Sequence, residues 1–181
     1  GRFPSVEVFE LPFTMTNAEA TSRAYWDLFK SDMEETEFKG VKILATWVHG
    51  PGVIHAKGEG VRKLEDMQGK KMRGPTRVIN GFLAELGSEP VGMPVPAIPE
   101  ALSKGVIDGP VIPWEVTTAL KVAELVDTHT EFAGDTALYT AAFVLAMNQA
   151  KYDSLPDDLK KVIDDNTGAD FSAYAGKTMA S

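Results

Sequence analysis

The sequence contains no cysteine, and this absence excludes several kinds of site. Without thiols there is no thiol catalysis, no disulfide scaffold and no cysteine-bound zinc. Positive charge is also scarce, since 18 Lys and Arg residues stand against 26 Asp and Glu, for a formal net charge of −8. An acidic chain is poorly suited to coat a phosphate backbone, so we expect no nucleic-acid partner.

Long apolar runs are missing as well. A membrane-spanning helix needs roughly 20 consecutive apolar residues, and the longest apolar stretch here, residues 137–147, is interrupted by Tyr139 and Thr140. We therefore expect a chain that is not embedded in a membrane. The chain opens with residues 1–4 (GRFP) and shows no secretory leader, which we interpret as a processed or trimmed N-terminus.

The common catalytic and cofactor motifs are absent too. There is no Gly-rich dinucleotide fingerprint, no P-loop, no GxSxG and no HExxH. The three histidines are His49, His55 and His129, of which the first two flank a Pro-Gly loop. A polar loop contact explains these two better than a shared metal ion. We expect neither a metal nor a cofactor.

What is present is the composition of a folded domain, with 44% hydrophobic and 24% charged residues. Strands and helices alternate from residue 41 to 122, a pattern that predicts βα units and a mostly parallel sheet. Residues 1–16 are expected to be a loop with a short extended piece at 6–9. The expected strands are 41–48, 53–56, 70–73, 90–93, 106–112, 125–132 and 138–147, and the expected helices are 18–36, 76–86, 99–104, 114–122 and a long one from about 156 with a bend at Gly168.

The segment 70–76 (KKMRGPT) carries three cations at a strand end, directly before a helix. Ligands of open α/β sheets bind at the carboxyl ends of strands. A guanidinium at Arg73 can hold a carboxylate through two parallel hydrogen bonds, which Lys does less rigidly. The alternative is a surface strand whose basic side chains reach solvent.

Trp114 follows another predicted strand, at the start of a helix that opens with Pro113. An aromatic side chain in this place can form a stacking wall for a planar or apolar ligand. A core tryptophan that anchors the helix is an equally good explanation.

Four blocks of the chain resemble, in order, those of DctP-type solute-binding proteins, the extracytoplasmic receptors of TRAP (tripartite ATP-independent periplasmic) transporters. The blocks are Val61–Arg73, Leu86–Met93, Pro99–Gly109 and Leu155–Ile163. The resemblance implies an α/β, two-lobed periplasmic-binding-protein-like fold with hinge strands and a long C-terminal helix. It also implies that the fold is incomplete here: 1–50 is part of lobe I, 51–136 is the carboxylate-binding lobe II, and 137–181 returns to lobe I.

The resemblance places the family's carboxylate-binding arginine on Arg73. Ile112 stands where the family often has a ligand-binding Asn, and Val53 where sialic-acid receptors have a second Arg. Both departures favour a smaller or more apolar carboxylate, such as an aromatic, branched or cyclic monocarboxylate. A C4-dicarboxylate would need a second cation, for which His55 is the nearby candidate, and Phe13 is the candidate for the opposing wall.

We therefore expect a periplasmic receptor that binds a small organic carboxylate, makes and breaks no bond, and delivers the ligand to TRAP membrane permease subunits. The expected ligand-binding residues are Arg73, Trp114, Phe13, His55 and Ile112. Two alternatives remain. One is a small α/β enzyme acting on a carboxylate substrate, with Arg73 as the anchor and His49 or His55 as general base. The other is a receptor that feeds a sensor domain rather than a transporter.

Overall fold

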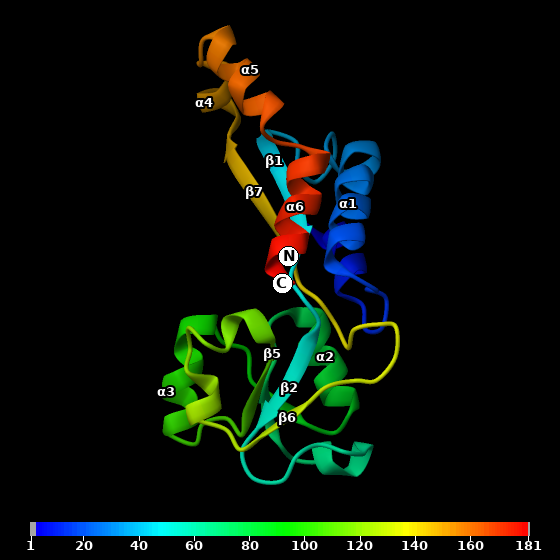
Figure 1. Cartoon of the computed structure of the whole chain (residues 1–181), viewed down its shortest axis with the longest axis vertical. Coiled ribbons are helices and arrows are strands. Elements are labelled where there is room, and N and C mark those ends of the chain that lie inside the picture. The colour runs from blue at the N-terminus through cyan, green and yellow to red at the C-terminus, as the bar shows by residue number, and fades with distance from the viewer. Residues whose placement is uncertain (1–2, 181) are drawn as a thin grey trace.

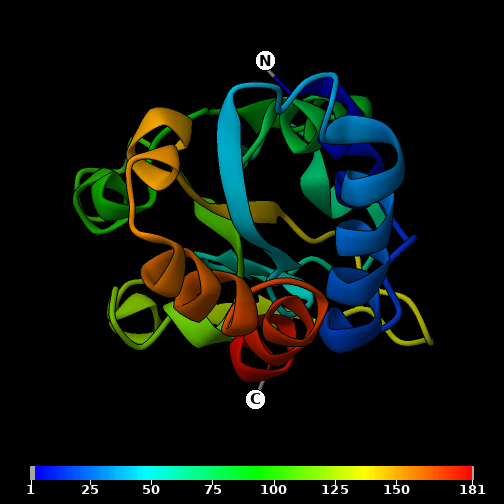
Figure 2. The same cartoon turned by 90° about the horizontal axis from the view of Figure 1, so that it is seen from above.

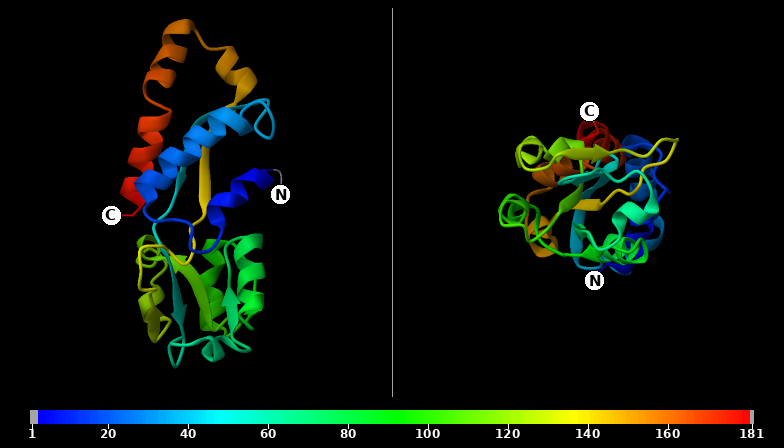
Figure 3. Two further views of the ribbon diagram at one scale, coloured as in Figure 1. Left: turned by 90° about the vertical axis from the view of Figure 1, so that its right-hand side faces the viewer. Right: turned by 90° about the horizontal axis from the view of Figure 1, so that it is seen from below.

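The computed structural model describes residues 3–180, which form two parts, one above the other in Figure 1. The upper part contains a two-stranded sheet, and the lower part contains a five-stranded sheet. Two strand-like segments connect them side by side (Figure 3). Each part has its own buried apolar cluster.

The upper part is an antiparallel strand pair with helices packed against it. Its strands are β1 (Val41–Val48) and β7 (Ala142–Asn148), and its helices are α1 (Ala18–Leu28), η2 (Phe29–Met33), α4 (Gln149–Asp153), α5 (Asp157–Asp165) and α6 (Ala169–Met179). Seen from above, α1 and α6 lie next to each other beside β1 (Figure 2). Their core is a buried cluster that centres on Tyr25, Phe29 and Phe38.

The first helix begins where the sequence predicts. The side chain of Asn17 accepts a hydrogen bond from the backbone N–H of Ala20 at 2.7 Å, which satisfies one of the free donors of the first turn. The predicted end at residue 36 is wrong, because the helix widens into the π-helical turn η2 and stops at Met33. Gly40, with φ +84, then turns the chain into β1.

The predicted long C-terminal helix is divided into α5 and α6. Gly168 separates them with a φ of +100°, a backbone conformation that residues with a side chain rarely adopt. Its N–H donates to the Leu44 carbonyl at 2.8 Å. Leu44 lies at an irregularity in the pairing of β1 with β7, so its carbonyl is available to a partner outside the strand pair. The hydrogen bond from Gly168 to this carbonyl fixes the break between α5 and α6.

The lower part is built on a mixed sheet with the order β4-β3-β5-β2-β6. Its strands are β2 (Gly52–Ala56), β3 (Lys71–Arg73), β4 (Glu89–Pro90), β5 (Gly109–Pro113) and β6 (Thr128–Thr130). β3 pairs in parallel with β4 and β5, whereas β2 pairs antiparallel with β5 and β6. The prediction of a mostly parallel sheet is therefore wrong for half of the pairings, because β2 enters the sheet directly from β1 without a crossover helix.

Helices cover both faces of this sheet. α2 (Arg77–Glu85) packs on one face, where Val111 of β5 joins Ile79 and Leu83 in a buried cluster. α3 (Ile98–Ser103) packs on the opposite face, where the next residue of β5, Ile112, joins a second cluster. Alternate residues of a strand point to opposite faces. We call these the α2 face and the α3 face.

Other element boundaries differ from the predictions. The extended piece expected at 6–9 is wrong, since η1 (Pro4–Glu10) is a 3-10 helix that touches both β7 and α2. The helix expected at 114–122 is only the short 3-10 turn η5 (Trp114–Val116). The strand expected at 125–132 shortens to β6, and the one at 138–147 begins only at Ala142. Among residues 3–180, every helix is too short or too polar to cross a bilayer.

Residues 49–52 and 139–141, which we call the junction, carry the chain between the two parts. Gly52 N–H donates to the Tyr139 carbonyl at 2.9 Å, and the Thr140 hydroxyl donates to the His49 carbonyl at 2.8 Å. The imidazole of His49 accepts from Ala141 N–H at 3.1 Å. Side chains thus supply the hydrogen bonds that the backbone pairing lacks at this point.

We predict that Gly52→Ala destabilises the junction. A Cβ at Gly52 would lie 1.9 Å from the Tyr139 ring, which is buried and has no room to move. We expect the free energy of unfolding to fall by about 1–3 kcal/mol. Gly81→Ala is the matched control, because a Cβ at this position in α2 meets no atom within 4 Å, and we expect it to stabilise by about 0.5–1 kcal/mol. Chemical denaturation measures both, and equal effects would contradict the prediction.

Candidate functional site

Arg73 is the last residue of β3 and is only 3% exposed. The turn that follows it is tight, because a Cβ at Gly74 would lie 2.3 Å from the side-chain oxygen of Asn80 on α2. Thr76 then starts α2, and its hydroxyl oxygen accepts from Ile79 N–H at 3.3 Å. Arg73 is therefore fixed at the carboxyl end of a strand, next to the beginning of a helix.

The Arg73 guanidinium is a buried cation without an anion. Its Nε donates to the Met93 carbonyl at 3.1 Å, and no carboxylate among residues 3–180 pairs with it. Burial lowers the pKa of Arg73 from its usual value, and no neighbouring carboxylate opposes this shift. Burying an uncompensated charge costs several kcal/mol. Such a group is suited to a ligand that brings the missing negative charge.

Arg73 lies close enough to the junction to act on its ionisable groups. Tyr139 is buried, and its hydroxyl donates to the Val111 carbonyl at 3.0 Å. Burial raises the pKa of Tyr139, and the positive charge of Arg73 acts against this shift. Burial lowers the pKa of His49 to about 4, and Arg73 contributes to the lowering. One signal in the sequence points to these neighbours, namely the polar residues at 139 and 140 within an apolar run.

Glu10, at the end of η1, is a second charged group buried near the junction. It is 7% exposed and accepts a hydrogen bond from Ala142 N–H at 3.3 Å. Burial raises the pKa of the Glu10 carboxyl, while bonds from Ala142 and Thr76 act in the opposite direction. Glu10 makes no ion pair with Arg73, so its carboxylate does not act as the counter-ion of this cation.

Three of the five ligand-binding residues expected from the sequence belong to the lower sheet, and a fourth, Trp114, directly follows one of its strands. Three of these side chains face α3, because each is adjacent in its strand to a residue of the buried cluster on the α2 face. They are Arg73, His55 and Ile112. Trp114 directly follows β5, the strand of Ile112. Ile112 is 1% exposed and packs within the α3-face cluster. Phe13 lies on the α2 face instead, against Phe82 of α2. The structure thus does not bring Phe13 together with the other four.

His55 is fully buried and uses both ring nitrogens. Its Nε2 lies 3.1 Å from the Ile112 carbonyl, which can only accept, so Nε2 carries the proton. Its Nδ1, 2.7 Å from Nδ1 of His129, is then the acceptor. Burial, reinforced by the nearby His129 ring, lowers the pKa of His55 to about 4. His55 is therefore neutral at pH 7 and supplies no second cation.

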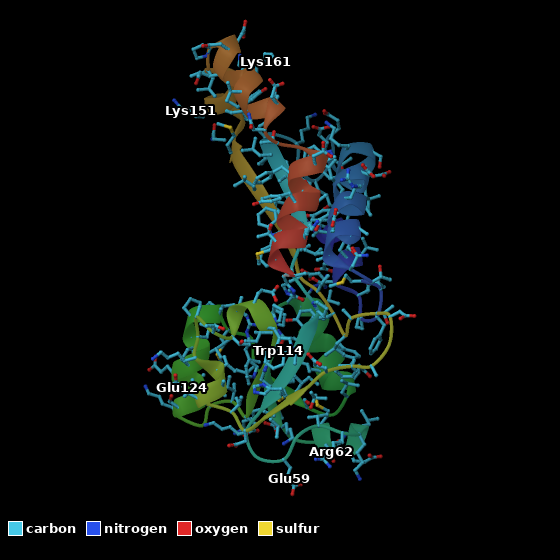
Figure 4. All side chains as sticks on the ribbon, in the orientation of Figure 1. Glu59, Arg62, Trp114, Glu124, Lys151 and Lys161 are labelled. Carbon is cyan, nitrogen blue, oxygen red and sulfur yellow. The ribbon has the colours of Figure 1, made fainter. Side chains whose placement is uncertain are left out.

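Trp114 is 42% exposed and lies in the lower part (Figure 4). Its ring packs against His55 and His129 at centroid distances of 5.0 and 4.8 Å, and its Nε1–H donates to Glu131 at 2.6 Å. A cavity of about 400 Å³ opens beside it. Three acidic residues line this cavity, Glu115, Glu131 and Asp135.

The comparisons with known proteins decide the family. The family model for DctP, bacterial extracellular solute-binding protein family 7, matches residues 1–170. The chain belongs to this family. DctP proteins are non-enzymatic receptors found outside the cytoplasm.

Solved structures of the DctP family share this fold. A TRAP solute-binding protein from Rhodoferax ferrireducens, in complex with copurified benzoate, is 55% identical, with a TM-score of 0.95 over 99% of this chain and 56% of its own. A marine metagenome TRAP solute-binding protein specific for aromatic acid ligands, crystallised with 3-hydroxybenzoate, is 49% identical, with a TM-score of 0.96 and the same coverage. The mixed α/β fold therefore matches about half of a two-lobed protein.

More distant relatives cover a similar share. The C4-dicarboxylate-binding periplasmic protein DctP of Rhodobacter capsulatus is 28% identical over 85% of this chain and 45% of its own length. The chain spans about half the length of the relatives it matches. The enzyme alternative finds no support, because the ring nitrogens of His49 and His55 are engaged in hydrogen bonds and the family consists of receptors.

We predict that lowering the pH from 6.5 toward 4 destabilises the protein through His49 and His55. Each has a folded pKa of about 4, below the unfolded value of 6.5, so the unfolded chain binds protons first. The stability from each neutral ring is complete above pH 6.5 and is lost as the pH falls, at up to about 1.4 kcal/mol per pH unit.

Denaturation at a series of pH values measures this dependence. His49→Gln and His55→Gln should each reduce the slope of the free energy of unfolding against pH, because each removes one group that titrates between the two states. Comparison with the unchanged protein cancels the contribution of the carboxylates. An unaltered slope in both variants would show that the buried histidines do not carry the effect.

Proposed function

We propose that the chain is part of a periplasmic receptor of a TRAP transporter, that it binds a small aromatic monocarboxylate, and that Arg73 holds the carboxylate. The observation that carries the proposal is the buried, anion-free guanidinium of Arg73. A carboxylate placed on it would form charge-assisted hydrogen bonds and remove the cost of the isolated charge.

Three features favour an aromatic monocarboxylate over a dicarboxylate. The two most similar structures described above hold benzoate and 3-hydroxybenzoate. His55 is neutral at pH 7, so the α3 face offers one cation rather than two. The apolar side chains of Val53 on β2 and Ile112 on β5 are register partners, and β5 is the direct neighbour of the strand that ends at Arg73. Ligand contacts of Trp114, His55 and Ile112 remain part of the proposal, whereas Phe13 lies on the α2 face and is not part of this site.

The arrangement of the two parts supports binding by closure. We assign residues 1–50 and 137–181 to lobe I and residues 51–136 to lobe II, with the junction as the hinge. Arg73 belongs to lobe II but borders the hinge residues Tyr139 and His49. A ligand that reaches groups of both lobes only when they are close together shifts the equilibrium toward the closed form. The closed receptor then delivers the ligand to the permease.

We predict that Arg73→Ala weakens benzoate binding by about 30-fold or more, since truncating one partner of a buried charge pair costs 2–5 kcal/mol. Isothermal titration calorimetry measures the change. Arg77→Ala is the control, because Arg77 lies nearby but is largely exposed and pairs with Glu7 at the surface. Its affinity should stay within about threefold of the original. Unchanged binding in Arg73→Ala would remove Arg73 from the site.

Arg73→Ala also separates function from stability. A buried cation without a partner does not stabilise the unliganded protein. We therefore expect the melting temperature of the unliganded variant to fall only by the amount that the lost packing of the side chain explains. We also expect that benzoate no longer raises this melting temperature. A variant that unfolds at room temperature would instead assign Arg73 a structural role.

We predict that benzoate and 3-hydroxybenzoate bind at least tenfold more tightly than succinate. We expect Trp114→Ala to reduce this ratio of dissociation constants. The Trp114 ring supplies apolar area to an aromatic body but none to a dicarboxylate. Thermal unfolding in the presence of each acid ranks the three affinities, because a ligand at 100 times its dissociation constant raises the free energy of unfolding by about 2.7 kcal/mol. An unchanged ranking together with a lower melting temperature would make Trp114 a core residue only.

A further inference from the structure

A second cavity, of about 380 Å³, opens on the α2 face of the lower part. We call it the aryl groove. Its walls are mostly apolar and come from five separate stretches of the chain. The apolar wall residues include Phe13, Ile54, Met67, Phe82, Leu86 and Phe132. Arg73 points to the opposite face of the sheet, so the groove is separate from the site proposed above.

Three phenylalanine rings frame the aryl groove. The Phe13 ring meets the rings of Phe82 and Phe132 edge-on, at centroid distances of 6.2 and 6.1 Å. Rings that present their edges and faces in this way accommodate a further aromatic ring in the same geometry. Phe13 and Phe132 are 48% and 39% exposed, so this aromatic surface faces solvent rather than the core.

Phe13 adopts a backbone conformation that a bulky residue rarely accepts. Its φ is +62, in the left-handed region, and its N–H is held by the Ala137 carbonyl at 3.1 Å. Strain of this kind persists when the surrounding structure enforces it, and it concentrates at functional sites. Here it turns the Phe13 ring from the loop after η1 toward the lower part.

Two cations lie on the rim of the aryl groove. Arg62 and Lys63 are exposed, and both line the cavity. The carboxylate of Asp66 is occupied by their backbone N–H groups, at 2.9 and 3.2 Å. Arg62 has no ion pair within residues 3–180, and Lys63 only approaches Glu65 at 4.0 Å.

One acidic residue, Glu131, also lines the aryl groove. Its carboxylate accepts the Nε1–H of Trp114 at 2.6 Å and is engaged there. In a chain with a formal net charge of −8, a pair of available cations beside exposed aromatic rings is a local exception. This combination complements a molecule with an aromatic ring and one negative charge.

We propose that the aryl groove is a second binding site, for a small aryl acid whose ring lies among Phe13, Phe82 and Phe132 and whose anionic group faces Arg62 and Lys63. The apolar walls supply most of the affinity, and the two cations select for negative charge. This site does not depend on Arg73 or on the function proposed above.

A pair of fluorescent probes tests the groove. 8-Anilinonaphthalene-1-sulfonate and N-phenyl-1-naphthylamine share one ring system, and only the first carries a negative charge. We expect the sulfonate to bind with a stoichiometry of one and at least threefold more tightly than the uncharged amine. Arg62→Gln combined with Lys63→Gln should remove this preference, since two exposed ion pairs account for a several-fold change.

The charge-matched control is Lys151→Gln combined with Lys161→Gln. These residues lie at the far end of the upper part, whereas Arg62 lies at the bottom of the lower part (Figure 4). The control changes the net charge equally and should leave the preference for the sulfonate intact. If both double variants lose the preference for the sulfonate over the amine, that preference depends on overall charge alone, and the proposal is overturned.

Phe13→Gly tests the aromatic wall without straining the chain, because glycine accepts a positive φ. We expect sulfonate binding to weaken at least fivefold while the melting temperature holds. Arg73→Ala should leave sulfonate binding unchanged. Sulfonate binding that is lost in Arg73→Ala but kept in Phe13→Gly would place the probe in the Arg73 site and overturn the proposal. Binding of several sulfonate molecules with low affinity, or no binding at all, would also overturn it.

Discussion

A buried positive charge without a counter-ion is the constraint around which this structure is organised. Arg73 ends β3 at the place where the lower sheet meets the junction, and its described neighbours offer one carbonyl and no carboxylate. A folded chain tolerates such a group only when the rest of the fold stabilises it. The two apolar clusters on the faces of the lower sheet provide that stability, and the Arg73 charge remains available to a ligand.

The junction connects this charge to the arrangement of the two parts. The side chains of His49 and Thr140 satisfy the backbone where the strand pairing of the upper part ends. The Tyr139 hydroxyl donates instead to the Val111 carbonyl in the lower sheet. The same burial that lowers the pKa of His49 makes the junction sensitive to acid.

The sequence predicted most elements of the lower part but not the pairing of their strands. β2 and α2 lie close to their expected bounds, because an apolar β-rich run and a capping Thr76 are local signals. The failures share one cause. Antiparallel pairing of β2 with β5 and the short turn at Trp114 depend on contacts between residues far apart in the chain, which periodicity does not encode. The position of Phe13 against Phe82 on the α2 face depends on such contacts as well.

The sequence by itself determined the family, the alternation of strands and helices, and the position of Arg73 at a strand end before a helix, because these depend on residue types at short spacing. Only the tertiary structure decided which charges are paired. It removed His55 as a cation by burying it against Ile112 and His129, and it left Arg73 without an anion. Burial and long-range hydrogen bonds set the charge state of a side chain, and neither exists until the chain has folded.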